Sequence, residues 1–198
     1  MHLCNFILQW NINCLKTKFP RLEELLGTEN VNIIALQETK NPPNKDIKIR
    51  GYNIYKKDRN IHGGGVLLAI HKNIASSPLT INSNLEIVAC TVHFQNQKIN
   101  ICNIYLPDHA QIDYDTFTNL LTSIPEPKLI LGDFNARHTS WGSEDTCPRG
   151  IILSDCFNDN DLLVLNDGSP TRYDKFRDSY SHIDVLLKNL RAPTFKYP

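Results

Sequence analysis

Short apolar runs that end in polar residues constrain this chain more than any other feature of its sequence. Residues 129–131 lead directly into GDFNARHTSWG, and the run VNIIALQE, residues 31–38, ends in a glutamine and a glutamate. Runs of this length that are rich in β-branched residues predict buried strands. Polar groups at the ends of buried strands are costly unless they form turns or a reaction centre. The sequence therefore predicts sheets whose strand ends carry either turns or a site.

The apolar pattern predicts more strands than helices. The expected strands are residues 3–10, 31–38, 52–55, 65–70, 85–94, 98–106, 129–131, 162–165 and 182–187. The expected helices are residues 19–26, with Pro20 in the first turn and Gly27 as the stop, 114–124 and 150–157. Residues 85–94 and 98–106 are expected to form a hairpin, with Ile99, Ile101, Asn103 and Tyr105 on one face. Because strands mostly follow strands, an α/β (α+β) fold with two mixed β-sheets covered by helices is favoured over a doubly wound sheet.

Composition indicates one ordinary globular domain over residues 1–198. The chain is 41% hydrophobic and 21% charged, and it contains no low-complexity linker or repeat that would divide it. Lys plus Arg and Asp plus Glu both total 21, so the net charge is zero. No overall field attracts nucleic acid or a membrane, although an enzyme that meets phosphate at one local site fits this balance.

Cysteine usage and the first residues predict a soluble, intracellular protein. The six cysteines form no CxxC pair and no close Cys/His cluster, which favours reduced thiols over disulfides. MHLCNFILQW has no basic leader region, and its apolar stretch is too short to span a bilayer.

Five strand ends carry polar residues, and each has an ordinary explanation when it is taken alone. Asn11 and Asn13 are typical turn residues, and Glu38 could be a solvated loop charge. Tyr105 could be a tyrosine at the core edge, Asp133 an Asx-turn and His138 a surface or packing histidine. Ser181-His182-Ile183-Asp184 opens the last strand.

The joint occurrence of these groups predicts phosphodiester chemistry. Mg²⁺ prefers oxygen ligands and usually takes one or two carboxylates together with water and substrate phosphate. A lone glutamate beside amide oxygens therefore suits Mg²⁺ better than it suits zinc. Hydrolysis further needs a carboxylate for the attacking water, here Asp133. It also needs donors for the charge that grows on phosphate, which Asn11, Asn135, Tyr105 and His138 could supply.

The series WN-N, LQET, N-Y-P, GDFNARH–WG and S-ID, in this order, resembles the endonuclease/exonuclease/phosphatase superfamily. More narrowly, GDFNARHTSWGS followed by Arg149-Gly150, Leu165-Asn166, Pro170-Thr171 and SHID is similar to the apurinic-type endonuclease domain of LINE-like (non-LTR, jockey-type) retrotransposons. The resemblance spans residues 8–187. LQE and GDFN are shared across the superfamily, whereas the longer pattern is specific.

The resemblance implies a DNase I-like, four-layered sandwich with the site at one edge. Glu38 would be the principal ligand of Mg²⁺ or Mn²⁺, with Asn11 close to metal and phosphate. Asp133 would activate the water, while Asn135 and Tyr105 would orient it or contact phosphate. His138 would border the site, with Asp184 near it and with Asn13 and Trp141 facing phosphate or DNA. The implied function is to nick target DNA in the nucleus, leaving a 3′-hydroxyl that a downstream reverse transcriptase domain extends on element RNA.

The chain departs from the family pattern at three places. Asn13 stands where repair relatives carry aspartate, and Cys14 stands where glycine is usual. No Ser-Asp-His segment follows the SHID strand, so weak activity and an unpaired sheet edge beside that strand are expected. Two alternatives remain open: a catalytically inactive remnant that folds and binds DNA, and a phosphatase or phosphodiesterase of the same superfamily.

Overall fold

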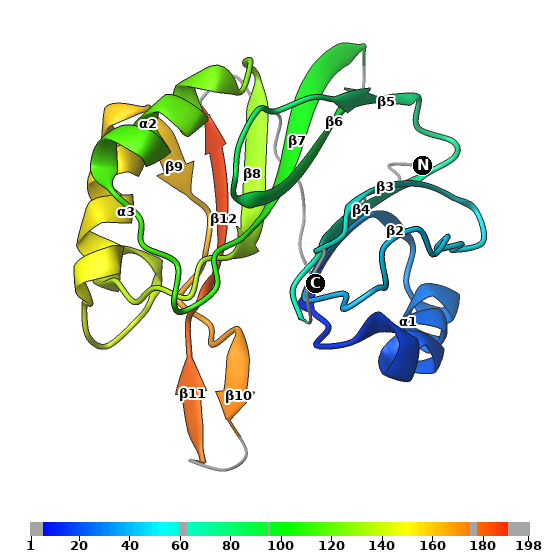
Figure 1. The fold of residues 1–198 in the computed structure, drawn as a ribbon, viewed down its shortest axis with the longest axis horizontal. Coiled ribbons are helices and arrows are strands. Elements are labelled where there is room, and N and C mark those ends of the chain that lie inside the picture. Colours follow the sequence, from blue (N-terminus) through cyan, green and yellow to red (C-terminus); the bar gives the residue numbers. More distant parts are fainter. Residues whose placement is uncertain (1–5, 60–62, 95, 175–177, 190–198) are drawn as a thin grey trace.

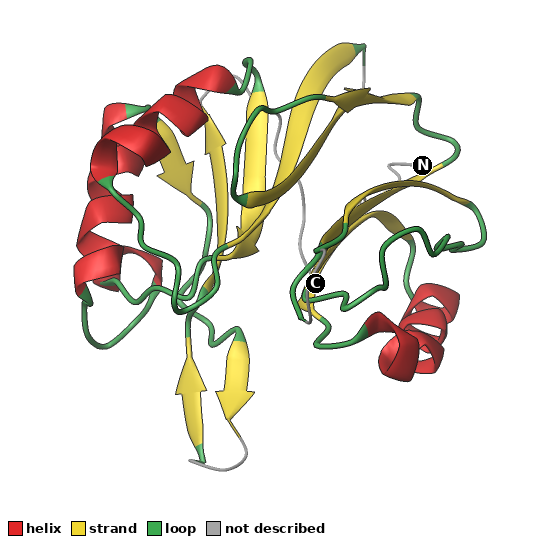
Figure 2. Ribbon diagram, in the orientation of Figure 1, coloured by secondary structure: helices red, strands yellow, loops and turns green. Residues whose placement is uncertain are grey.

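The chain folds into two packed β-sheets with helices on both outer faces. A computed structural model describes residues 6–59, 63–94, 96–174 and 178–189. Helices α2 and α3 cover one sheet, helix α1 covers the other, and the two sheets face each other between them (Figures 1 and 2). This is the four-layered α/β arrangement of two mixed sheets that the sequence and the resemblance predict.

The first sheet is built from residues 6–71 and has the strand order β1-β2-β4-β3. Its elements are β1 (Phe6–Asn11), α1 (Leu15–Thr28), β2 (Val31–Gln37), β3 (Tyr52–Lys57) and β4 (Val66–His71). Strands β1 and β2 are parallel and α1 connects them, whereas β4 runs antiparallel to both of its neighbours. Every residue of β2 is buried because one face packs on α1 and the other on the second sheet. This double burial explains the uninterrupted apolar run of residues 33–36, IIAL.

The second sheet has the strand order β5-β6-β7-β8-β12-β9. Its elements are β5 (Ser76–Leu79), β6 (Glu86–Phe94), β7 (Gln97–Tyr105), α2 (Tyr114–Ser123), β8 (Lys128–Asp133), a 3₁₀ helix (Thr139–Trp141), α3 (Pro148–Asp159), β9 (Leu162–Val164) and β12 (Asp184–Asn189). Strands β6 and β7 form the predicted antiparallel hairpin, and β7 pairs with β8 in parallel. A separate two-stranded ribbon, β10 (Arg172–Asp174) and β11 (Ser179–Ser181), projects from the body (Figure 1).

A buried polar bridge joins the two sheets inside their apolar interface. Gln37 Nε2 donates to Asn103 Oδ1 at 2.6 Å, and Asn103 Nδ2 donates to the main-chain oxygens of Leu36 and Leu67, both at 2.9 Å. Gln37 and Asn103 are fully buried. Gln37 Oε1 is buried without a hydrogen-bond partner among the described residues, but the three hydrogen bonds of this bridge fix how β2 and β7 sit against each other.

The structure corrects several expectations about individual elements. Helix α1 begins before Pro20 and continues past Gly27 to Thr28, so neither residue marks a boundary. The Pro20 ring is exposed, while Leu15 and Leu22 of the same helix are packed in the core. Strand β5 and the β10–β11 ribbon were not expected, since neither carries an apolar run.

Strand β12 also differs from expectation, because it lies between two strands of the sheet. It pairs with β8 on one side and with β9 on the other, so the predicted open edge beside the SHID strand is wrong. The five cysteines that the structure describes are free thiols; Cys4 and the beginning of the strand predicted at residues 3–10 lie outside the described residues. Within the described part of the chain, no helix has the length and apolar character needed to span a membrane.

Candidate active site

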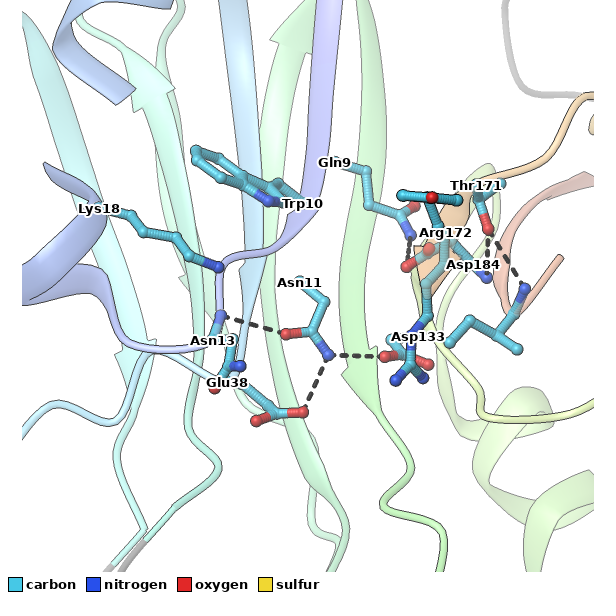
Figure 3. A pocket seen from close by; sticks show the side chains of 12 residues that line it. Gln9, Trp10, Asn11, Asn13, Lys18, Glu38, Asp133, Thr171, Arg172 and Asp184 are labelled. Atoms are coloured by element: carbon cyan, nitrogen blue, oxygen red, sulfur yellow. Dashed lines mark hydrogen bonds between the residues drawn. The ribbon is translucent and has the colours of Figure 1, made fainter. Parts of the chain in front are cut away.

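The polar strand ends of both sheets meet at one cleft of about 540 Å³. Strand β1 and the segment after β2 line it from the first sheet, and the ends of β8 and β12 line it from the second (Figure 3). The lining residues are Gln9, Trp10, Asn11, Asn13, Lys18, Glu38, Asp133, Thr171, Arg172, Tyr173, Ile183 and Asp184. Five of the residues predicted from sequence therefore share one cavity: Asn11, Asn13, Glu38, Asp133 and Asp184.

Glu38 follows directly after β2 and has a left-handed backbone, with φ +51°. Its Oε1 accepts hydrogen bonds from Asn11 Nδ2 at 3.0 Å and from the Tyr105 hydroxyl at 2.9 Å, and Lys40 Nζ lies 3.3 Å from Oε2. Burial works to raise the pKa of Glu38, but the hydrogen bonds from Asn11, Tyr105 and Lys40 outweigh it and the net pKa is lowered. Glu38 is thus held in its ionised form, and the solvated loop charge considered from sequence is excluded.

Asn11 joins the carboxylates of the two sheets. Its Nδ2 also donates to Asp133 Oδ2 at 2.7 Å, so one amide nitrogen lies between Glu38 and Asp133 (Figure 3). Its Oδ1 accepts from the Asn13 backbone amide at 3.2 Å, which is the turn geometry expected of an asparagine. Asn13 in turn accepts a hydrogen bond from Lys40 Nζ. Asn11 therefore has the turn contact and the site contact at once.

Asp133 ends β8 and is 1% exposed. Burial, reinforced by the charge of Asp184, raises the pKa of Asp133 to about 7 against the hydrogen bond from Asn11. Asp184 faces Asp133 across the β8–β12 pair and accepts from Gln9 Nε2 at 3.0 Å. Part of the Asp184 residue reaches solvent, but protein atoms enclose its carboxyl group, and this burial raises the pKa of Asp184 to about 6.

Asn135 and Tyr105 border the cleft, because each donates a hydrogen bond to a carboxylate that lines it. The backbone amide of Asn135 donates to Asp133 Oδ1 at 3.0 Å, so the Asx-turn considered from sequence is present within the site itself. Asn135 has φ +46°, and its Nδ2 donates to the Leu106 carbonyl at 3.0 Å. Tyr105 is nearly buried, and burial together with its bond to Glu38 raises the pKa of its hydroxyl. The hydroxyl therefore remains a protonated donor at neutral pH.

Two predicted site residues are structural instead. Trp141 is 0% exposed, packs against Phe157 and donates Nε1 to the Ala136 carbonyl, so its expected contact with DNA is wrong. His138 caps the 3₁₀ helix, where Nδ1 accepts from the Ser140 amide at 3.0 Å, and its ring lies against Trp141. It does not line the cleft, so the catalytic assignment of His138 is corrected to a capping role.

Sequence reasoning missed eight lining or bordering residues, two of which are Tyr173 and Ile183. Gln9 holds Asp184, Lys40 balances Glu38, and the Thr171 hydroxyl accepts from the Asp184 amide at 3.2 Å. Trp10, Lys18 and Arg172 complete the wall. Gln9 and Lys40 do stand in polar strand ends, and Thr171 stands in the Pro-Thr motif, which could have found them. Lys18 and Arg172 lie in a helix and a ribbon, where only the fold brings them to the cleft.

The oxygen atoms that line the cleft suit a hard divalent cation as ligands. Glu38 and Asp133 present carboxylate oxygens on either side of one amide, and Asn11 carries a further amide oxygen. Among the described residues no group of three or more His, Cys, Asp or Glu side chains forms a metal cage. A few oxygen ligands, completed by water and a substrate phosphate, are typical of such an ion and not of a zinc centre.

The fold and this carboxylate-lined cleft fit a phosphoester hydrolase. The chain belongs to the Endonuclease/Exonuclease/phosphatase family, whose model matches residues 8–191. Nucleases of this family depend on a divalent metal.

Relatives and solved structures agree with this assignment. The chain is 27% identical over 187 residues to the probable RNA-directed DNA polymerase from transposon X-element of Drosophila melanogaster, covering 91% of this chain and 21% of that protein. It is also 27% identical over 169 residues to the RNA-directed DNA polymerase from mobile element jockey of the same species, covering 83% and 18%. This chain thus spans about a fifth of the length of these relatives.

Two solved structures share the fold. The endonuclease domain of TRAS1, a telomere-specific non-LTR retrotransposon, superposes with a TM-score of 0.77 at 20% identity, over 93% of this chain and 84% of that one. The catalytic domain of Xenopus laevis APE2 superposes with a TM-score of 0.70 at 17% identity, over 93% and 82%.

Proposed function

We propose that this chain is the DNA endonuclease domain of a non-LTR retrotransposon, which nicks target DNA with Mg²⁺ or Mn²⁺ and leaves a 3′-hydroxyl. The observation that carries the proposal is the cleft in which Asn11 links Glu38 of one sheet to Asp133 of the other. The similarity to transposon RNA-directed DNA polymerases and to the TRAS1 endonuclease domain supports the retrotransposon setting.

In this function the chain's own residues divide the work. Glu38, with Asn11 beside it, would hold the cation; when bound, Mg²⁺ would supply positive charge against the phosphate. Asp133 accepts a proton from the attacking water, and its pKa of about 7 suits a base at neutral pH. As the water oxygen bonds to phosphorus, the bond from phosphorus to the 3′ oxygen breaks, and that oxygen takes up a proton.

The remaining polar groups act on the phosphate. The Tyr105 hydroxyl stays protonated at neutral pH and donates its single proton to Glu38, so it would reach a phosphate oxygen only by giving up that hydrogen bond. Lys18 and Arg172 supply positive charge along the same wall. The backbone amide of Asn135 keeps Asp133 in orientation, and Asn13 would add a polar group to the wall of the cleft that faces a bound cation or phosphate. Donors placed where charge develops typically contribute about 10²–10³ in rate.

The proposal extends to the setting in which the domain works. DNA is the substrate, and a downstream reverse transcriptase would extend the 3′-hydroxyl on element RNA. The nick would be made in the nucleus, where target DNA resides. The aromatic and basic residues of the cleft wall, Trp10, Lys18 and Arg172, fit a nucleic-acid strand laid along it.

Plasmid nicking tests the proposal. Supercoiled plasmid is incubated with the protein and Mg²⁺, with and without chelator, beside an Asp133→Asn protein purified in the same way to exclude contaminating nuclease. The expected product is an open circle whose 3′ end a DNA polymerase extends directly. Retardation of plasmid without nicking would favour the inactive DNA-binding alternative. Release of phosphate from inositol phosphates without nicking would favour a phosphatase.

A further inference from the structure

Arg149, the second residue of α3, has no part in the proposed reaction, yet it makes several hydrogen bonds close to the site. Its guanidinium reaches the main-chain oxygens of two loops at once. Nη1 lies 3.1 Å from the Asn135 carbonyl and 3.4 Å from that of Phe134. Nη2 lies 3.1, 2.7 and 2.6 Å from the carbonyls of Pro107, Asp108 and Ala110.

The two loops are the ones that follow Tyr105 and Asp133. Direct hydrogen bonds join them at their beginnings, where the Leu106 backbone amide donates to the Asp133 carbonyl at 2.9 Å and Asn135 Nδ2 donates to the Leu106 carbonyl at 3.0 Å. Beyond these bonds the loop after β7 runs without a strand partner until α2 begins at Tyr114. Arg149 joins the loops at this point.

Arginine suits this position better than any other side chain. Its planar guanidinium carries several N–H donors in a fixed fork, and charge-assisted hydrogen bonds are stronger than neutral ones. Arg149 forms no ion pair with the residues that the structure describes, so its donors are available to the carbonyls. A lysine ammonium is a single point and could not span both loops.

The start of α3 is pressed against the chain that follows Asn135, which brings Arg149 within reach. Cys147 caps the helix, with Sγ accepting from the Gly150 and Arg137 amides at 3.4 and 3.3 Å. A Cβ at position 150 would lie 2.0 Å from the Arg137 carbonyl, so only glycine permits this approach. The Arg149-Gly150 motif is thereby accounted for: Gly150 allows the contact and Arg149 uses it.

We propose that Arg149 is a positioning residue that fixes the loop of Asp133 and Asn135 relative to the loop of Tyr105. It acts through main-chain oxygens and touches neither substrate nor metal. The inference rests on the proposed function for its kinetic effect, but its effect on loop order does not. Misplacing a catalytic group by about 1 Å can cost about 10²-fold in rate, so loss of Arg149 should lower kcat while leaving the DNA-binding wall intact.

The kinetic experiment compares Arg149→Ala, Arg149→Lys and the control Arg137→Ala, an exposed arginine of the same segment paired with Asp145. For Arg149→Ala we expect kcat for nicking to fall about 10–100-fold, with KM for DNA changed less than about threefold. Arg149→Lys should fall between Arg149→Ala and the wild type, and Arg137→Ala should match the wild type. Low millimolar guanidinium should restore part of the kcat of Arg149→Ala and should not change Arg137→Ala. Wild-type kcat in Arg149→Ala, or an unchanged kcat with a raised KM, would overturn the assignment.

Hydrogen exchange separates this inference from the proposed function. The Leu106 and Asn135 amides should exchange at least about tenfold faster in Arg149→Ala and Arg149→Lys than in the wild type, while the core amide of Ile130 in β8 stays unchanged. If the wild type does not nick plasmid, the proposed function fails, yet this readout still tests the loop contact. Unchanged exchange at both loop amides in a folded Arg149→Lys protein would overturn the positioning role, whether or not Arg149→Ala folds.

Discussion

The two sheets bring carboxylates of opposite character to the same cleft. Glu38, from the first sheet, is held by two neutral donors and Lys40, and its pKa is lowered. Asp133 and Asp184, from the second sheet, are enclosed by protein, and burial raises their pKa values to about 7 and about 6, with the charge of Asp184 adding to the shift at Asp133. The opposite directions of these pKa shifts come from the surroundings of each group and not from residue type. Glu38 accepts hydrogen bonds from more donors than Asp133 or Asp184 does.

This difference teaches how one cleft can serve two chemical roles. A cation ligand must stay ionised at every working pH, which the lowered pKa of Glu38 secures. A general base works best with a pKa near the working pH, which burial gives to Asp133. Four changes would break or sharpen this division, beginning with the largest expected effect.

Glu38→Gln removes the ionised carboxylate of the first sheet while keeping its shape. We expect nicking with Mg²⁺ to fall by about 10³-fold or more, because the cation loses its principal charged ligand. The rate is measured across a Mg²⁺ titration, and Mn²⁺ binding is measured separately. The exposed Glu24→Gln on α1 is the control. Undiminished cleavage by Glu38→Gln at low Mg²⁺ would remove Glu38 from the site.

Asp133→Asn removes the base of the second sheet. We expect kcat to fall by about 10²-fold, within the range for loss of a general base, with Mn²⁺ affinity reduced far less than in Glu38→Gln. Single-turnover nicking at saturating Mg²⁺ measures this effect. A mutant that nicks at the wild-type rate would reduce GDFN to a turn.

The raised pKa values predict how stability depends on pH in the metal-free protein. A carboxyl group whose pKa is higher in the folded state stabilises that state below its unfolded pKa, and this stability is lost as pH rises through the folded value. Asp133 and Asp184 should therefore make the protein less stable at pH 7.5 than at pH 5, by on the order of 2 kcal/mol. The contribution of Glu38 has the opposite sign and is lost only as pH falls below the ordinary pKa of a glutamate.

Urea unfolding in the presence of chelator measures this dependence. The Asp133→Asn protein should show a flatter profile between pH 5 and pH 7.5 and should be more stable than the wild type at the higher value. A wild-type protein whose stability rises across this interval would contradict the raised pKa values.

Cys14→Gly tests the free-energy cost of the left-handed backbone at Cys14, which lies on the side of the site that the first sheet provides. Cys14 has φ +89° directly before α1, a conformation that glycine adopts with little strain. We expect the free energy of unfolding to rise by about 1 kcal/mol. Cys14→Ser removes the thiol, retains Cβ and should give no gain. Equal stability of the two variants would assign any change to the thiol.

Much of this division could be predicted from the sequence, because strand ends are local signals. Glu38 and Asp133 follow apolar runs whose length and composition indicate buried strands, and the order of the motifs indicates the family. The roles of His138 and Trp141 could not be predicted in the same way. Both belong to the specific part of GDFNARHTSWG, but the chain turns after Asn135, buries Trp141 and uses His138 as a cap.

The remaining lining residues depend on contacts between distant segments. Gln9 meets Asp184 across 175 positions, and Arg172 reaches the cleft on a ribbon with no apolar pattern. The pKa values also lie beyond sequence reasoning, since the shifts at Asp133 and Asp184 arise from burial that only the folded chain creates, with the charge of Asp184 adding to the shift at Asp133. Residue type predicts the chemistry available, and tertiary packing decides the ionisation.

The Gln37–Asn103 bridge has a consequence for the order in which the site comes into being. The first sheet comes from one continuous stretch of chain and the second from the next. Residues 72–75 form the covalent link between them. Gln37 immediately precedes Glu38, and Asn103 stands two residues before Tyr105, so the bridge brings the ligand and the tyrosine together when the halves dock. Either half alone holds an incomplete set of groups. A chain cut within residues 72–75 would therefore be a split enzyme, and the return of nicking on mixing its fragments would report their reassembly.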